Sequence, residues 1–263
     1  MQSDRWTIEQ TKLAFHLYCQ LPFGKLDQRN PEVIELAQLI TRTPSAVAMK
    51  LVNFASLDPA ITGSGRKGLS NASALDRAVW EAFNADWEGL AVECQQLRDS
   101  LAAQAASGNT PLDPGVARLE RIDFTGESRT VVTEQRIKQA FFRRAVLSSY
   151  RGRCCMSGLD EPRLLIASHI VPWSQDKRNR LNPRNGLCLS TLHDRAFDQG
   201  LIALTDDLGV IVSRELQRSK NEFIQSIFQP LQGRTIETPE RFVPSPEFLG
   251  WHRSERFVDN RVA

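Results

Sequence analysis

Two of the four histidines in this 263-residue chain, His169 and His193, bracket Asn185 in a segment whose residue pattern constrains the fold more than any other stretch. Residues 164–170 form an apolar run that has the length of a strand. Pro172 cannot donate a hydrogen bond to a neighbouring strand, so the strand is expected to end close to His169. The sequence therefore predicts that His169 lies at a strand end.

The residues after this strand predict a loop, a second strand and a helix. Residues 174–185 are rich in Asn, Arg, Lys and Pro and lack an apolar period, which is typical of an exposed loop. A short strand is expected over residues 186–189, and Ser190 is suited to cap the start of a helix. Gly200 is suited to the left-handed position that follows a helix. The predicted unit is strand, loop, strand and helix, with His193 on the helix.

The order and spacing of these residues resemble the HNH endonuclease family, in particular the branch found in restriction and defence proteins. The matching elements are Ser-His-Ile, Pro-Trp, Asn-Gly-Leu, Leu-His and Phe-Asp-x-Gly, in that order between residues 168 and 200. The resemblance implies the ββα-metal finger of this nuclease superfamily. It also implies metal-dependent hydrolysis of phosphodiester bonds.

Phosphodiester hydrolysis explains why two histidines and an asparagine would lie together. A general base must take a proton from water near neutral pH, and an unperturbed imidazole titrates close to that range. The resemblance assigns this role to His169. A cation beside the scissile phosphate neutralises the charge that builds on its oxygens, and His193 can bind one. By the same resemblance, the side-chain amide of Asn185 orients the ring of the base.

One position departs from the family pattern. Many HNH enzymes carry Asp or Glu as a metal ligand immediately before the catalytic histidine, whereas this chain has Ser168. Either His193 holds the metal with waters and substrate oxygens, or Asp194 or Asp198 supplies a second contact. Asp198 can equally cap or pair locally. We expect His193 and Asp198 as ligands and Mg²⁺ or Mn²⁺ as the metal, because Mg²⁺ keeps several waters and needs few protein ligands.

The five cysteines lack the spacing of a structural zinc site. Cys154 and Cys155 are adjacent, Cys19, Cys94 and Cys188 are isolated, and no Cys-x-x-Cys pair exists. We therefore expect no structural zinc held by four cysteines, and we interpret the thiols as small buried side chains in a reducing cytoplasm. The N-terminus lacks the apolar core of a signal peptide and no run reaches membrane length, which also favours a cytoplasmic location.

Positive charge is concentrated around the histidine segment, although the formal net charge is only +2. Residues 136–153 contain six basic side chains and no acidic one, and residues 163–184 contain five against Asp176 alone. This distribution favours contact with the phosphates of double-stranded DNA, and the alternative is a solvated helix face. The loop residues that we expect to bind phosphate are Lys177, Arg178, Arg180 and Arg184.

The first hundred residues predict a helical unit. Helices are expected over residues 7–19, 31–40 and 44–54, and a Thr-Pro pair favours the start of the third helix. Helix, short turn and helix form the outline of a helix-turn-helix DNA reader, in which Lys50 is expected to lie on the outward face and bind nucleic acid. The alternative is a three-helix bundle that does not contact DNA.

The small-residue stretch 101–116 predicts a linker and a domain boundary near residue 110. The fold class expected is α+β. Residues 1–110 form an all-α, helix-turn-helix-like targeting domain, and residues 111–263 form the HNH nuclease domain, which we expect to retain some cleavage by itself. Residues 75–101 predict a single long helix. After the finger, residues 201–213 predict a hairpin that extends the nuclease sheet.

The sequence thus predicts a cytoplasmic, metal-dependent DNA endonuclease whose catalytic residues are His169, Asn185 and His193. Bacterial restriction or phage defence is the setting that the resemblance implies. Double-stranded DNA is the expected partner, and a homodimer is left open. Two alternatives remain. One is a catalytically inactive DNA-binding or regulatory protein whose finger lost catalysis with Ser168, and the other is an RNA-cleaving toxin with the same site.

Overall fold

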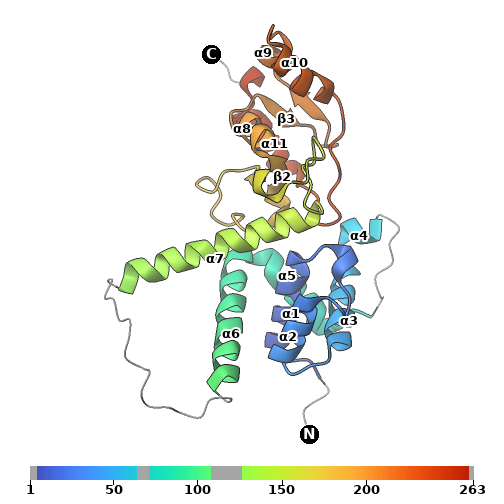
Figure 1. The fold of residues 1–263 in the computed structure, drawn as a ribbon, viewed down its shortest axis with the longest axis vertical. Helices are drawn as coiled ribbons and strands as arrows, with labels where there is room; N and C mark the ends of the chain where they lie inside the picture. Colours follow the sequence, from blue (N-terminus) through green and yellow to red (C-terminus); the bar gives the residue numbers. More distant parts are fainter. Residues whose placement is uncertain (1–4, 64–70, 108–125, 261–263) are drawn as a thin grey trace.

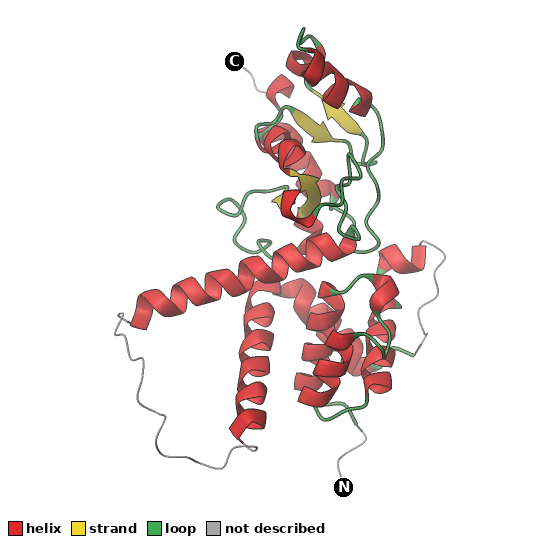
Figure 2. Ribbon diagram, viewed as in Figure 1, coloured by secondary structure: helices red, strands yellow, loops and turns green. Residues whose placement is uncertain are grey.

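The computed structural model describes residues 5–63, 71–107 and 126–260. A mostly helical N-terminal part and a C-terminal part with two small sheets lie on opposite sides of one long helix, α7 (Gly126–Ser149) (Figures 1 and 2). This mixture is compatible with the α+β class. The expected boundary near residue 110 lies outside the described residues. None of the helices in the described ranges has both the length and the apolar character needed to cross a membrane.

The N-terminal helices begin at residues whose side chains cap free N–H groups. The helices are α1 (Ile8–Gln20), α2 (Pro31–Leu39), α3 (Pro44–Ala55), α4 (Pro59–Gly63), α5 (Ala74–Ala85) and α6 (Trp87–Ser107), with a 3-10 turn at Phe23–Lys25. The Thr7 hydroxyl accepts a hydrogen bond from the N–H of Gln10 in a capping box. The Thr43 hydroxyl accepts one from the N–H of Ala46, so the predicted start of the third helix is confirmed.

The single helix expected over residues 75–101 is two helices, α5 and α6. Asp86 interrupts it with φ −147° and ψ 84°, and its carboxylate accepts a hydrogen bond from the N–H of Gly89 at 2.8 Å. A Cβ at Gly89 would lie 2.3 Å from that carboxylate, so a larger residue there would displace the Asp86 side chain from this contact. The apolar pattern does not indicate the break, because both helices pack against α1 and so apolar residues recur on both sides of Asp86.

Lys50 is buried, which corrects the expectation that it lies on an outward face and binds DNA. Its Nζ forms an ion pair with Asp76 at 2.7 Å and lies 4.6 Å from the centre of the Trp6 ring. The exposed residues of α3 are Ser45 and Met49, and neither is charged. The prediction failed because a lysine can be buried where its stem packs on apolar groups and a carboxylate neutralises its charge.

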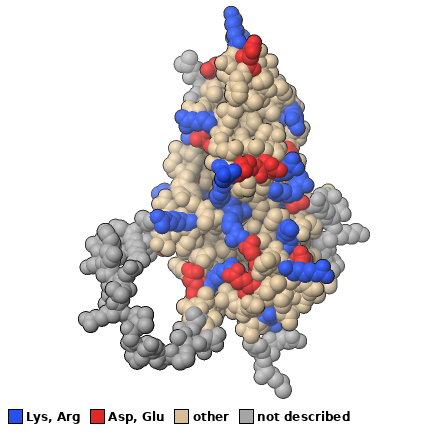
Figure 3. Space-filling model, viewed as in Figure 1, with Lys and Arg blue, Asp and Glu red and all other residues tan. Residues whose placement is uncertain are grey.

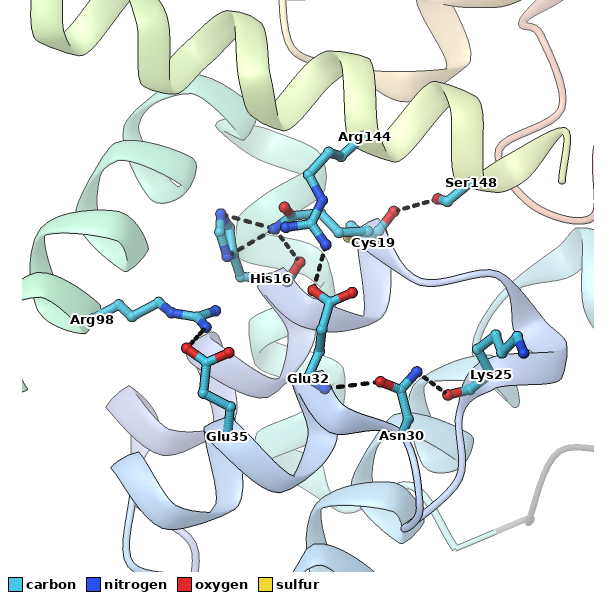
Figure 4. A network of polar contacts seen from close by, with 10 residues as sticks. His16, Cys19, Lys25, Asn30, Glu32, Glu35, Arg98, Arg144 and Ser148 are labelled. Atoms are coloured by element: carbon cyan, nitrogen blue, oxygen red, sulfur yellow. Dashed lines mark hydrogen bonds and ion pairs between the residues drawn. The ribbon is translucent and has the colours of Figure 1, made fainter. Parts of the chain in front are cut away.

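Helix α7 packs against both parts of the molecule (Figure 1). On the N-terminal side, Phe141 stacks on His16 with ring centres 5.0 Å apart, and Arg144 forms an ion pair with Glu32 of α2. Figure 4 shows this ion pair together with the Ser148 hydroxyl, which donates a hydrogen bond to a carbonyl of α1 at 3.2 Å. Helix α7, at the start of the C-terminal part, therefore packs against the helices of the N-terminal part.

The predicted strand, loop, strand and helix are all present. They are β1 (Leu165–His169), β2 (Gly186–Ser190) and α8 (Thr191–Asp198), with 3-10 turns at Pro162–Leu164 and Pro183–Asn185. The strands pair antiparallel with His169 opposite Gly186. Ser190 caps α8 by accepting a hydrogen bond from the N–H of His193 at 3.3 Å, and Gly200 has the expected left-handed backbone with φ 71°.

The predicted hairpin is confirmed, but it does not extend the sheet of β1 and β2. Its strands, β3 (Ile202–Leu204) and β4 (Val210–Val212), form a separate two-stranded sheet. The remaining elements are α9 (Arg214–Gln217), α10 (Glu222–Phe228), α11 (Pro246–Glu255) and 3-10 turns at Gln229–Leu231 and Val258–Asn260. The hairpin is separate because the chain turns at Gly200 and packs β3 against α8 and α11.

The segment between α10 and α11 returns to the N-terminal part. Arg241 is completely buried, and its guanidinium donates hydrogen bonds to the carbonyls of Tyr18 and Leu21 at the end of α1. It also donates a hydrogen bond to the Ser148 hydroxyl of α7 at 3.1 Å. The buried apolar residues of both parts form one continuous cluster, so the C-terminal part is not packed independently of the first helices.

Candidate active site

His169 lies at the end of β1, and neighbouring groups hold its ring from three directions. One face stacks on the Phe142 ring of α7, with ring centres 3.8 Å apart and planes 9° apart. Nε2 lies 2.9 Å from the carbonyl oxygen of Arg180. The Trp173 ring is nearly perpendicular to the imidazole, with ring centres 5.6 Å apart. Because a carbonyl oxygen only accepts, Nε2 carries the proton and donates it. Nδ1 is therefore the nitrogen that can take a proton.

The surroundings of His169 favour the neutral ring. Burial lowers the pKa of His169 below its ordinary value of 6.5, and the hydrogen bond to the Arg180 carbonyl and the charge of Asp198 oppose this shift. The net effect is a lowered pKa, which keeps the imidazole unprotonated near neutral pH. That is the state a general base requires.

Asn185 is completely buried, and its amide holds the chain that follows His169. Oδ1 accepts a hydrogen bond from the N–H of Val171 at 2.8 Å, and Nδ2 donates one to the carbonyl of the same residue at 3.0 Å. The Asn185 carbonyl accepts a further hydrogen bond from the N–H of Ile170 at 3.0 Å. The expectation that the amide orients the His169 ring directly is corrected: Asn185 fixes the backbone, and the Arg180 carbonyl contacts the ring.

The His193 ring is buried at the start of α8 and faces the loop that contains Cys154. Nδ1 lies 2.9 Å from the Ser190 hydroxyl and 3.6 Å from the Cys154 sulfur. Nε2 is buried and has no hydrogen-bond partner among the described residues. When Nδ1 carries the proton, its N–H is held by these neighbours and Nε2 keeps a free lone pair. This is the arrangement that a metal-binding imidazole requires.

The loop at Cys154 supports β2 and His193. The N–H of Cys155 donates a hydrogen bond to the carbonyl of Cys188 in β2 at 2.8 Å. Burial raises the pKa of the Cys154 thiol, but hydrogen bonds with His193 and Ser157 outweigh burial and lower that pKa to about 6. All five cysteines are buried, as the sequence predicts, and none forms a disulfide. The contact of Cys154 with His193 is one that spacing alone did not indicate.

Ser168, the residue that departs from the family pattern, faces α8. Neighbouring side chains in a strand point to opposite faces, so Ser168 and His169 face α8 and α7 respectively. Burial and the charge of Asp198 raise the pKa of Asp194, and together they outweigh the nearby Ser168 hydroxyl, which lowers it. Asp198 lies one turn further along α8, and its charge acts on His169. The two carboxylates therefore lie near the end of β1.

The donor atoms that α8 contributes are Nε2 of His193 and the carboxylates of Asp194 and Asp198. Within the described ranges, no three His, Cys, Asp or Glu side chains converge into a complete metal site. Carboxylate oxygens and waters suit Mg²⁺ and Mn²⁺, which take few protein ligands, whereas a structural zinc site needs four. A hard divalent cation that draws most ligands from water and substrate fits these residues.

The four basic loop residues face different ways. Lys177 and Arg178 are exposed. Arg180 donates from Nε to the carbonyl of Trp173 at 2.9 Å and lies over the ring of the same residue. Arg184 is half-buried, and its charge acts on a carboxylate of the N-terminal part. Of these four predicted phosphate-binding residues, Lys177 and Arg178 are therefore the two whose charges are open to solvent.

A groove of about 520 Å³ lies between this loop and the junction of α6 and α7. Basic loop residues line it together with acidic residues of both helices, and the charged lining residues are Lys138, Lys177, Arg178, Arg180, Asp86, Glu88, Glu93 and Glu134. On the face shown in Figure 3, basic and acidic side chains are interspersed across the middle of the molecule. The concentration of positive charge in the sequence thus does not become one uniform basic surface on this face.

The profile of a known enzyme family matches the region that contains this site. Residues 154–205 match the HNH endonuclease family. This segment is of the HNH type. It contains β1, β2, α8 and β3, and with them His169, Asn185 and His193, whereas α7 lies outside the match. A search of curated proteins finds no relative of the chain.

Sequence reasoning missed the contact between Phe142 and His169. In the sequence, Phe141 shares an apolar stripe with Ile137 and Ala140 at helical spacing, and that stripe does not include Phe142. Two adjacent bulky apolar residues on one helix point in different directions, about 100° apart, which indicates a helix buried on two sides. The Phe141–Phe142 pair is therefore the signal that could have predicted a second contact surface on α7.

Proposed function

We propose that this protein is a metal-dependent endonuclease that hydrolyses phosphodiester bonds of double-stranded DNA. The observation that carries the proposal is the state of His169. Its Nε2–H is held by a carbonyl, its Nδ1 is available, and burial lowers its pKa. The HNH match over residues 154–205 supports nuclease chemistry in general.

In the proposed reaction, Nδ1 of His169 takes a proton from a water molecule as that water attacks the phosphorus atom. The bond between phosphorus and the leaving oxygen breaks, and solvent protonates that oxygen. Asn185 holds the backbone after β1 and so keeps the ring at the strand end. Lys177 and Arg178 are proposed to contact phosphates that flank the cleaved bond.

We assign the cation to α8, with Nε2 of His193 and the Asp198 carboxylate as ligands and with Asp194 as the alternative carboxylate. Bound Mg²⁺ or Mn²⁺ supplies positive charge at the scissile phosphate and the leaving oxygen. Ser190 contributes by holding Nδ1 of His193, which leaves Nε2 for the metal.

The proposed setting is restriction or phage defence in a bacterial cytoplasm, and it rests on the family resemblance. The N-terminal helices are proposed to bind the target duplex through residues other than Lys50, whose charge Asp76 neutralises. Dimerisation would let two sites cut both strands, and it is part of the proposal.

Cleavage of supercoiled plasmid by the purified full-length protein tests this function. We expect nicked or linear plasmid with Mg²⁺ or Mn²⁺, and intact plasmid with a chelator. RNA incubated in parallel tests the alternative that the protein is an RNA-cleaving toxin. Cleavage of RNA without cleavage of DNA would overturn the proposed substrate, and cleavage that persists in the chelator would overturn the metal.

A catalytically inactive DNA-binding or regulatory protein is the second candidate. The observation in its favour is Ser168, a neutral and buried side chain at the position where many family members carry a carboxylate ligand. Under this reading the wild-type protein binds duplex and does not cut it with any divalent metal. The variant Ser168→Asp would then gain metal-dependent cleavage.

A further inference from the structure

We propose that Phe142 of α7 is a positioning residue for His169, an inference that rests on the proposed nuclease function. Phe142 is buried and precedes the residues that match the HNH family. Its ring lies nearly parallel to the imidazole, with ring centres 3.8 Å apart and an angle of 9°. The contact is made by a helix that this chain places beside the HNH segment.

Gly186 makes this contact sterically feasible. It lies opposite His169 in the strand pair, on the side where α7 approaches. A Cβ at Gly186 would lie 3.0 Å from Cζ of Phe142 and 2.4 Å from Cγ2 of Val146. Any other residue at position 186 would displace the Val146 and Phe142 side chains or the helix that bears them. The missing side chain allows α7 to lie close enough for the two rings to stack.

The ring contact restricts a motion that the hydrogen bond alone leaves open. The Arg180 carbonyl fixes Nε2, but a ring held at one atom can still tilt about that atom. The parallel Phe142 ring blocks tilting toward α7, and the Trp173 ring packs nearly perpendicular to the imidazole. The lone pair of Nδ1 therefore points in one fixed direction. General-base catalysis depends on that direction, since a misplacement of about 1 Å can reduce the rate on the order of 100-fold.

Phe141 supplies a matched control. It is the preceding residue, is buried to a similar degree, and also stacks on a histidine, but that histidine is His16 of the N-terminal part. Its ring centre lies 5.0 Å from that of His16, with an angle of 17° between the planes. Replacing either phenylalanine removes a buried aromatic stack from the same turn of α7. Only the Phe142 stack involves the candidate base.

The test compares Phe142→Leu with Phe141→Leu in the full-length protein, with rates corrected for the folded fraction. We expect Phe142→Leu to lower kcat by about 10- to 100-fold while KM stays within about twofold, because the ring positions the base and the substrate interactions remain. Phe141→Leu should leave kcat per folded molecule unchanged.

Gly186→Ala should lower kcat by displacing the Phe142 ring. The double variant Gly186→Ala/Phe142→Leu should lose less than the product of the two single effects, since both act on one contact.

A nuclear magnetic resonance measurement gives a readout that needs no cleavage. The ring protons of His169 should be shifted upfield by the Phe142 ring in the wild type and in Phe141→Leu, and this shift should disappear in Phe142→Leu.

An equal decrease of kcat in both leucine variants would overturn the positioning role, as would an unchanged kcat in Phe142→Leu. If the wild type cuts neither DNA nor RNA, the proposed function fails, and no positioning role remains. An unshifted His169 ring in the wild type would overturn the contact itself.

Discussion

At the residue scale, the site uses buried polar groups to set the state of its histidines. The Arg180 carbonyl determines which nitrogen of His169 carries the proton, and Asn185 fixes the backbone that follows. Ser190 and Cys154 lie beside Nδ1 of His193, and Nε2 has no partner among the described residues. A buried polar group that loses its partner destabilises the fold by about 1–3 kcal/mol, and the Arg180 carbonyl, which can only accept, defines the tautomer of His169.

The lowered pKa of His169 predicts the pH dependence of cleavage. The ring is an active base only when unprotonated, so the rate should fall as pH falls through the pKa. Because burial lowers that pKa below 6.5, the midpoint of the acid limb should also lie below 6.5. Single-turnover rates over about pH 5–8 at saturating Mg²⁺ measure it. A midpoint above 6.5 would contradict a half-buried, neutral His169.

The carboxylates of α8 can be distinguished by metal binding in the absence of DNA. If Asp198 is a ligand, Asp198→Asn should weaken Mn²⁺ binding by about tenfold or more, since a neutral amide oxygen replaces a charged donor. His193→Ala should weaken it similarly. Asp194→Asn is the matched control, with the same substitution one turn earlier on the helix. Normal affinity in Asp198→Asn together with weak binding in Asp194→Asn would assign the ligand to Asp194 instead. Calorimetric titration measures all of these affinities.

At the element scale, local signals predicted most of the HNH segment. Pro172 ends β1, Ser190 caps α8 and Gly200 ends it, so the order and type of these elements follow from neighbouring residues. Contacts between distant residues could not be predicted in this way. The ion pair of Lys50 with Asp76 needs α3 and α5 to be adjacent, and no pattern within either helix encodes that.

The loop between the strands is the element proposed to contact flanking phosphates. The double variant Lys177→Ala/Arg178→Ala should weaken duplex binding and reduce the slope of log affinity against log salt by about one for each phosphate that the protein no longer binds. Arg218→Ala, an exposed arginine after α9, is the control and should leave the slope unchanged. Binding isotherms at several salt concentrations measure these slopes. An equal slope in the double variant and the wild type would remove the loop from the interface.

At the scale of the whole molecule, the C-terminal part depends on the first helices. Arg241 reaches the end of α1, and Phe141 and Ser148 of α7 contact the same helix. A fragment that begins near residue 115 would expose these side chains to water. The sequence predicts that such a fragment retains some cleavage activity, because the residue patterns of the two parts look like separate domains. The core that the two parts share depends on contacts between distant residues, which neither residue pattern indicates.

Arg241→Ala tests this dependence. The substitution leaves the buried carbonyls of Tyr18 and Leu21 without their donor, so it should lower the free energy of unfolding by about 1–3 kcal/mol for each carbonyl. Arg234→Ala, which removes an exposed arginine from the same segment, should change it by less than about 0.5 kcal/mol. Chemical denaturation of both variants measures the difference. Equal stabilities would mean that Arg241 does not join the two parts.

The central claim is that His169 is the general base of a phosphodiester hydrolase. The most direct measurement is the single-turnover cleavage rate of His169→Ala at saturating Mg²⁺, with duplex affinity measured on the same preparation. The claim predicts a rate lower by about 10²- to 10⁴-fold with affinity nearly unchanged, since the base acts on water and does not hold the duplex. A variant that binds the duplex and cleaves it at the wild-type rate would contradict the claim.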